Sequence, residues 1–274
     1  MSLGVVLTPT DNLTITVDYW EIEKDGTIGL FGEENHTLLD LVYRIEAGAA
    51  NCDSTGNSAV ERIAPDDDQL AAYAAAGICA AGDISRIVDQ YKNLDTRTMK
   101  GHDIGIYYDV DTDLGAFRFS YNGAFLDEFE QTAGGNAGTL VAAQAAGILP
   151  MNYPIDGFAD LVGRDGNQEE KHTARLSWRM NDFGASLSAY KIGEFYQSSL
   201  TLADGTRYVI PSMTTYDATF DYRTKVMGTK TRLRLGVKNF TDERAPLADR
   251  YFGYFSDAHT DYGRYMYLDV RASF

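Results

Sequence analysis

The feature that most limits the fold of this chain is a strict alternation of apolar and polar residues, repeated in eight segments. Neighbouring side chains of a β-strand point to opposite faces, so this period of two indicates strands with two unlike faces. The first seven segments begin near residues 13, 104, 117, 175, 185, 216 and 232. The last segment places Met266, Leu268, Val270, Ala272 and Phe274 on one face. Residues 4–9 indicate the end of a ninth strand.

The connections between these segments alternate between short and long. The short ones lie around residues 9–12, 112–115, 181–184 and 227–229, and the long ones cover roughly 26–92, 132–169, 198–208 and 241–261. Outer-membrane barrels combine short periplasmic turns with long extracellular loops. The pattern therefore predicts an all-β fold, an antiparallel up-and-down transmembrane β-barrel that is partial, with about 8–9 strands. Short helices are expected within the long loops, at 38–48, 66–77 and 137–147.

The second face of the predicted strands is strongly charged. Its members are Arg175, Arg179, Asp217, Asp221, Arg223, Arg232, Arg234, Lys238, Asp269 and Arg271. On a soluble barrel these side chains would be solvated, whereas in a membrane barrel they would line a polar lumen and pair with one another. Tyr19 with Trp20, Tyr107 with Tyr108, and Tyr265 with Tyr267 resemble an aromatic girdle, although strand propensity also explains them. The loop asymmetry and the terminal Phe274 favour the membrane.

Charge and cysteine content narrow the function classes. The formal net charge of −16 excludes nucleic acid as an expected partner, because phosphate binding needs a basic surface. Cys52 and Cys79 lie in a polar, loop-like region, and we predict a disulfide between them, with two free thiols as the alternative. No apolar run is long enough for a transmembrane helix, and no signal peptide is expected. The start of the chain is typical of a piece cut from a longer protein.

The sequence carries no pattern that indicates catalysis. The four histidines are scattered, without metal-ligand spacing, and no nucleophile elbow, phosphate-binding loop or dinucleotide fingerprint occurs. The segment 109–115, DVDTDLG, begins like a calcium-binding loop, but Leu114 replaces the required glycine and Ser120 the final glutamate. A solvated turn is predicted there instead. We therefore expect no enzyme activity, no metal and no cofactor.

Two groups of residues resemble known families. The terminal residues Met266, Leu268, Val270, Ala272 and Phe274 resemble the last strand of Gram-negative outer-membrane barrels, which the barrel-assembly machinery recognises. A second group resembles the end of TonB-dependent receptors. It consists of Val237, Asn239, Phe240, Asp242 and Pro246, followed by Gly263, Arg264 and Tyr265. Residues 13–28 and 93–110 resemble earlier strands of the same barrels.

The resemblance implies that residues 1–274 are the C-terminal portion of a receptor barrel in the outer membrane. Such receptors take up a scarce nutrient, for example a ferric siderophore, cobalamin or an oligosaccharide. The implied partners are outer-membrane lipid, the assembly machinery, a small ligand at the extracellular loops and, through a plug domain missing from this sequence, the TonB complex. The substrate-binding residues stay unknown. A porin or adhesin and a soluble ligand-binding β-barrel remain as alternatives.

Overall fold

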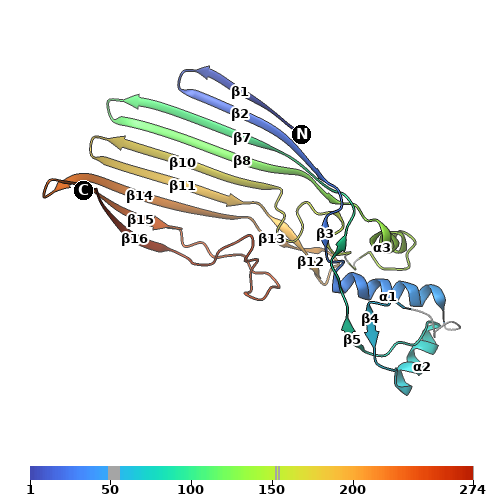
Figure 1. The fold of residues 1–274 in the computed structure, drawn as a ribbon. Helices are drawn as coiled ribbons and strands as arrows, with labels where there is room; N and C mark the ends of the chain where they lie inside the picture. The colour runs from blue at the N-terminus through green and yellow to red at the C-terminus, as the bar shows by residue number, and fades with distance from the viewer. Residues whose placement is uncertain (49–55, 152, 154, 274) are drawn as a thin grey trace. The chain divides into compact units, whose positions relative to one another are not determined.

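The computed structural model describes residues 1–48, 56–151, 153 and 155–273, and its main feature is one antiparallel sheet of nine long strands (Figure 1). The strands lie in the order in which they occur in the sequence, so each pairs with its chain neighbours. They are β1 (Ser2–Thr10), β2 (Leu13–Lys24), β7 (Arg97–Thr112), β8 (Gly115–Gln131), β10 (Glu170–Met180), β11 (Phe183–Ile192), β14 (Met213–Val226), β15 (Thr229–Lys238) and β16 (Tyr265–Ser273). The predicted up-and-down, partial-barrel fold is confirmed.

Two-residue turns join the strands at one end of each hairpin. They occupy residues 11–12, 113–114, 181–182 and 227–228. Met227 and Gly228 both have positive φ, 50° and 82°, which a tight hairpin of type I′ requires at its two central positions. The calcium-loop-like segment is one of these turns, because Thr112 ends β7 and Gly115 begins β8.

The chain divides into two compact units, which we describe separately. The first contains residues 1–22, 99–128 and 162–274, and it holds most of the sheet. It also contains a hairpin of β12 (Phe195–Thr201) and β13 (Arg207–Ile210). A small core consists of Phe195 and Ile210, which pair across this hairpin, together with Phe255.

The second unit contains residues 23–98 and 129–161. Its helices are α1 (Glu33–Ala47), α2 (Asp67–Ala76) and α3 (Gly135–Ala145). Its short strands are β3 (Ile28–Gly29), which pairs with β6 (Lys92–Asn93), β4 (Val60–Arg62), which pairs with β5 (Ile84–Ile87), and β9 (Ala159–Asp160), which pairs with the end of β8. A core between α1 and α3 includes the fully buried Leu39, Val42 and Leu140.

All three expected helices form, and α1 begins earlier than its local pattern suggested. The Asp89 carboxylate accepts the backbone N–H groups of Phe31 (3.3 Å) and Gly32 (2.9 Å), so a distant residue caps the first turn. Burial acts to raise the pKa of Asp89, but these two amides and His36 outweigh it and hold the pKa below the ordinary value. In α2 the cap is local, because Asp66 and Gln69 form a capping box.

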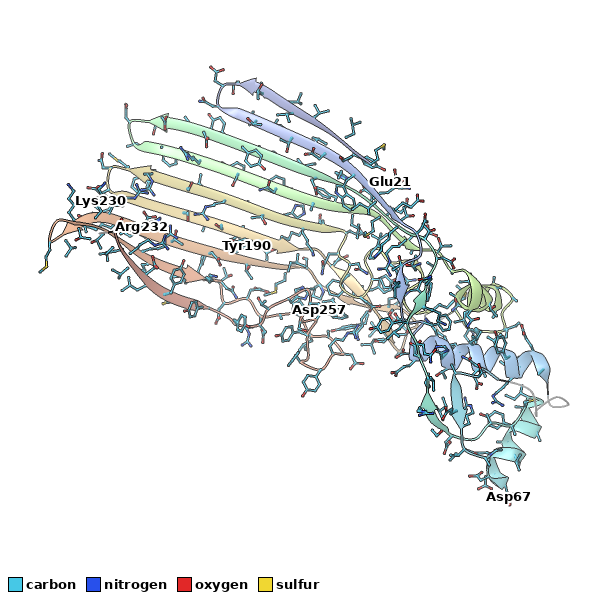
Figure 2. All side chains as sticks on the ribbon, in the orientation of Figure 1. Glu21, Asp67, Tyr190, Lys230, Arg232 and Asp257 are labelled. Atoms are coloured by element: carbon cyan, nitrogen blue, oxygen red, sulfur yellow. The ribbon has the colours of Figure 1, made fainter. Side chains whose placement is uncertain are left out.

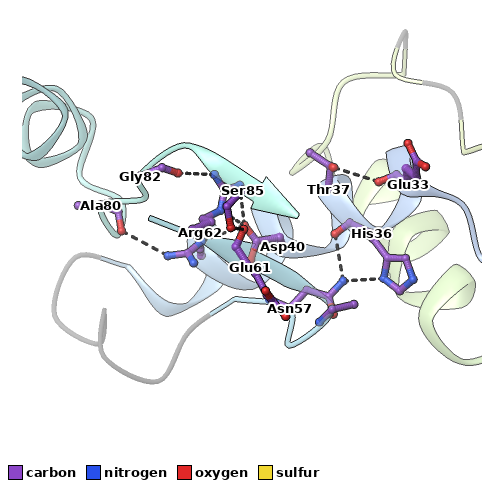
Figure 3. Close-up of polar contacts among 12 residues, drawn as sticks. Glu33, His36, Thr37, Asp40, Asn57, Glu61, Arg62, Ala80, Gly82 and Ser85 are labelled. Carbon is purple, nitrogen blue, oxygen red and sulfur yellow. Dashed lines mark hydrogen bonds and ion pairs between the residues drawn. The ribbon is translucent and has the colours of Figure 1, made fainter. Parts of the chain in front are cut away.

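A buried polar network ties α1 to the segment that follows it (Figure 3). The Asp40 carboxylate accepts hydrogen bonds from the Nε–H groups of Arg44 and Arg62, both at 3.0 Å, and from the backbone N–H of Asn57 at 2.8 Å. The Asn57 side chain in turn donates to the backbone oxygen of His36 at 3.0 Å. A buried carboxylate is stable here because its oxygens are fully paired.

No helix within the described ranges is both long and apolar enough to cross a bilayer.

Truncating the helical core should destabilise the second unit selectively. Leu140 is fully buried between α3 and α1, so Leu140→Ala should cost about 2–5 kcal/mol of unfolding free energy, as cavity-forming core substitutions do. Its neighbour Val141 is 39% exposed, and Val141→Ala should cost no more than about 0.5 kcal/mol. Hydrogen exchange of the α1 and α3 amides measures both effects, and equal costs for the two variants would contradict the packing described.

Candidate functional site

One face of the sheet is a continuous apolar surface. The register places Phe117, Trp178, Ala185, Phe220, Leu235 and Leu268 opposite one another across six strands. At the other edge, Leu3, Val5 and Leu7 pair with Tyr19, Val17 and Ile15. The neighbouring Thr16 faces the same side as Tyr107, which donates to Asn122 on the polar face, so these apolar residues continue the apolar face. Cross-strand neighbours of this kind form an unbroken apolar face rather than isolated contacts.

Many of the large apolar side chains on this face are exposed. Leu235 is 54% exposed, Leu268 69% and Leu3 69%. By contrast, Asp221 is only 5% exposed on the opposite face. A soluble barrel keeps its apolar face inside, and exposed apolar patches of this extent mark surfaces that contact lipid or another protein. The sheet therefore has the polarity of a membrane barrel.

The residues next to these along each strand point to the opposite side of the sheet and form its polar face. Here Ala116, Arg179, Gly184, Asp221, Arg234 and Asp269 stand opposite one another. Three arginines surround the Asp221 carboxylate, with nitrogen–oxygen distances of 2.8 Å to Arg232, 3.4 Å to Arg179 and 3.8 Å to Arg234. Figure 2 shows the side chains standing on the two faces, with Arg232 close to the β14–β15 turn.

The structure corrects the predicted aromatic girdle. Tyr265 and Tyr267 stack on each other, with ring centres 6.1 Å apart, and pair across the sheet with Lys238 and Gly236 on the polar face. The Tyr267 ring fills the space above Gly236, where an added Cβ would meet a ring atom at 2.2 Å. Tyr107 donates to Asn122 at 2.6 Å. The aromatic-girdle interpretation did not consider which face of the sheet each tyrosine occupies. It was wrong for Tyr265 and Tyr267, because a girdle lies on the apolar face.

The two halves of the receptor-like motif meet in space. The Asp242 carboxylate accepts the backbone N–H of Arg264 at 2.7 Å, and Gly263 turns there with φ of 67°. Asn239, itself at φ 47°, closes the preceding turn by pairing with both the N–H and the carbonyl oxygen of Glu243. These residues thus shape the chain at the ends of β15 and β16, where side-chain size and backbone conformation are both restricted.

The remaining motif residues occupy different surroundings. Val237 lies on the apolar face opposite Met266, and the Phe240 ring packs 5.9 Å from that of Tyr216. Pro246 is half-buried in the connection that follows. Tyr265 begins β16. The family roles assigned to all these positions stay predictions.

An ion pair joins the same two segments of chain. Arg244 donates through Nε to Asp261 at 2.7 Å and through Nη2 to the other carboxylate oxygen, and the Ala245 N–H donates at 2.9 Å. The Arg244 guanidinium and then the Ala245 amide hold the pKa of Asp261 at about 2, below its ordinary value of 3.8. Asp261 therefore fixes the residues after Asp242 to the residues before Gly263.

Two predicted features reach beyond the described residues. Met266, Leu268, Val270 and Ala272 form the exposed apolar edge of β16, but Phe274 lies outside the described range. Cys52 also lies outside it, so the disulfide stays a prediction. Cys79 is buried, and its Sγ donates to the carbonyl oxygen of Gly48 at 2.6 Å.

Three connections of the first unit pack together around the β12–β13 hairpin, which sequence reasoning did not anticipate. The buried Gln197 pairs with the N–H and carbonyl oxygen of Asp249 at 3.0 and 2.8 Å. Asp165 accepts the backbone N–H of Ser198 at 2.9 Å and also its hydroxyl. His259 is 1% exposed and stacks on Phe195, and burial lowers its pKa. These contacts join residues far apart in sequence, so no local pattern predicts them.

Among the described residues, no group of three or more histidine, cysteine, aspartate or glutamate side chains is arranged to hold a metal ion. The arrangement offers instead an apolar face and a charged polar face.

Comparison with known proteins supports the fold. No protein-family model and no curated protein sequence matches the chain. Solved structures do: a G324V mutant of the ferric enterobactin receptor PfeA from Pseudomonas aeruginosa is 14% identical with a TM-score of 0.54. The siderophore receptor PirA from Acinetobacter baumannii is 12% identical, also with a TM-score of 0.54. Each alignment covers 100% of this chain but only 30% or 31% of the receptor, so the shared fold is part of a receptor barrel.

The ion pair between Arg244 and Asp261 makes a pH-dependent prediction. Since the folded pKa is depressed, the stabilisation is fully present above pH 3.8 and is lost as the pH falls toward about 2. A carbon-13 NMR titration of the Asp261 carboxyl should find a midpoint near 2, and Arg244→Gln should raise this midpoint toward 3.8. A midpoint that Arg244→Gln leaves unmoved would show that this pair is not formed in solution.

Proposed function

We propose that this chain forms part of the wall of an outer-membrane receptor barrel in a Gram-negative bacterium. The observation that carries the proposal is the apolar face, on which Leu3, Leu235 and Leu268 are more than half exposed while Asp221 on the other face is buried. In a barrel wall the apolar face contacts lipid and the polar face lines the lumen, so each side chain meets a medium of its own polarity. Water on both sides would leave the apolar face without a partner.

Strand length agrees with this placement. A tilted strand needs about 9–11 residues to cross the apolar layer of a bilayer. β10 has 11 residues, β11 has 10 and β15 has 10. β7, β8 and β14 are longer, with 16, 17 and 14 residues, and would extend beyond the layer at one end.

The connections favour a receptor over a simple pore. All two-residue turns lie at one end of the strands, so the long connections leave from the other end, which would be the extracellular one. These connections are ordered by buried contacts such as Gln197 with Asp249. We propose that they contribute to binding a scarce nutrient, with a ferric siderophore as the first candidate because PfeA is a ferric enterobactin receptor and PirA a siderophore receptor. Energy-coupled uptake would need the plug of the longer protein and the TonB complex.

Two neighbouring positions on β16 test which face meets lipid. The chain has 2 tryptophans, so Trp20→Phe with Trp178→Phe leaves a background without tryptophan fluorescence. Into it, Leu268→Trp places the reporter on the apolar face and Tyr267→Trp places it on the polar face. In bilayers of brominated phospholipid, we expect strong quenching of the first reporter and little quenching of the second. Equal quenching of both, or a detergent-free soluble monomer, would refute the membrane role.

The receptor role needs a separate test in the longer protein. Replacing residues 202–206, the tip of the β12–β13 hairpin, with a two-residue Asn-Gly turn should reduce ferric siderophore uptake under iron limitation without reducing the amount of barrel in the outer membrane. A matched change of residues 113–114 to Asn-Gly, at the opposite end of the strands, should leave uptake unchanged. Equal uptake by all three proteins would favour a porin or adhesin instead.

A further inference from the structure

The polar face contains a cavity that the barrel-wall role does not explain. It has a volume of about 270 Å³ and is lined by Arg118, Arg175, Arg179, Arg232, Arg234 and Asp221. Small side chains leave the space open, among them Ala116 and Ser186. It lies toward the two-residue turns, since Arg179 and Arg232 are close to the ends of β10 and β15 there.

The lining carries a large excess of positive charge. Five guanidinium groups face a single lining carboxylate, in a chain whose formal net charge is −16. Two further acidic groups lie close, Asp109 at 3.9 Å from Arg118 and Asp269 as the cross-strand neighbour of Arg234. Even with both counted, cations outnumber anions. Clustered like charges repel unless an anion joins them, so this excess points to a ligand.

The hydrogen-bond donors of these arginines are also in excess. Nη1 of Arg179 and the Nε atoms of Arg232 and Arg234 are buried and have no hydrogen-bond partner within the described residues. Arg175 donates through Nη2 to the Ser186 hydroxyl, at 3.1 Å. A guanidinium presents five donors in a fixed fork that matches the oxygens of a carboxylate or phosphate. Asp221 already serves as one such oxyanion and holds three arginines in position.

We propose that this cavity is an oxyanion-binding site that takes a carboxylate or phosphate group beside Asp221. The ligand reaches it either as a free small anion or as a carboxylate side chain on a protein segment, and the chemistry of recognition is the same for both. Charge-assisted, bidentate hydrogen bonds supply the binding energy. The proposal does not depend on the membrane role, because it rests only on the cavity and its arginines.

Two substitutions with opposite expected effects test the site. Binding of citrate and of inorganic phosphate to the folded chain in detergent micelles is measured by isothermal titration calorimetry. Arg175→Gln should weaken binding about tenfold, the equivalent of one charge-assisted hydrogen bond. It leaves no carboxylate unpaired, because the partner of Arg175 is the Ser186 hydroxyl. Asp221→Asn should strengthen binding, because it removes the carboxylate that competes for the arginines.

The matched control is Lys238→Gln, which removes one positive charge from the same face of β15 outside the cavity. It should leave the affinity within about twofold, since exposed charges at a distance are screened by salt. A parallel titration with a glutamate-rich peptide identifies the source: peptide binding with the same response to the variants indicates a protein carboxylate, and citrate or phosphate binding alone indicates a free anion. Circular dichroism verifies that each variant is folded. Absence of binding to all three probes, or equal weakening by Arg175→Gln and Lys238→Gln, would overturn the proposal.

Discussion

The register between neighbouring strands is the constraint on which the rest of this structure depends. Every face described above follows from which residue stands opposite which, and the period along a strand is two. A slip of one residue between β14 and β15 would bring Leu235 to the polar face and Arg234 to the apolar one. The two-residue turn at Met227 and Gly228 resists such a slip, because its length and its positive φ angles allow a single pairing of the strands it joins.

Register also decides how the charges are stabilised. Asp221 is almost fully buried, and a buried carboxylate is costly unless its oxygens are paired. The cluster draws on three strands and not on one sequence segment: β14 supplies Asp221, β10 supplies one arginine and β15 supplies two. The same convergence creates the cavity, since the arginines that stabilise Asp221 retain donors that it cannot accept.

The sequence predicts those parts of the molecule that depend on neighbours in the chain. The alternation of residues 266–273 defines a strand and its two faces without reference to the rest of the fold, and the Asp66 and Gln69 capping box marks the start of α2. The start of α1 was not predicted, because its cap is Asp89, which lies 57 residues after Gly32. For the same reason, neither the pairing of Gln197 with Asp249 nor the position of Tyr267 over Gly236 was predicted. Each depends on two segments that only the folded sheet brings together.

The order of the strands has a consequence for how such a sheet can be built. Because each strand pairs with its immediate neighbours in the chain, the sheet can grow by one hairpin at a time, without threading a strand between two that are already paired. Closing a hairpin with a two-residue turn costs little chain entropy, whereas closing a long connection costs more. The four hairpins with two-residue turns are therefore natural units of assembly. Pairing between one hairpin and the next requires closing a long connection and should form more slowly.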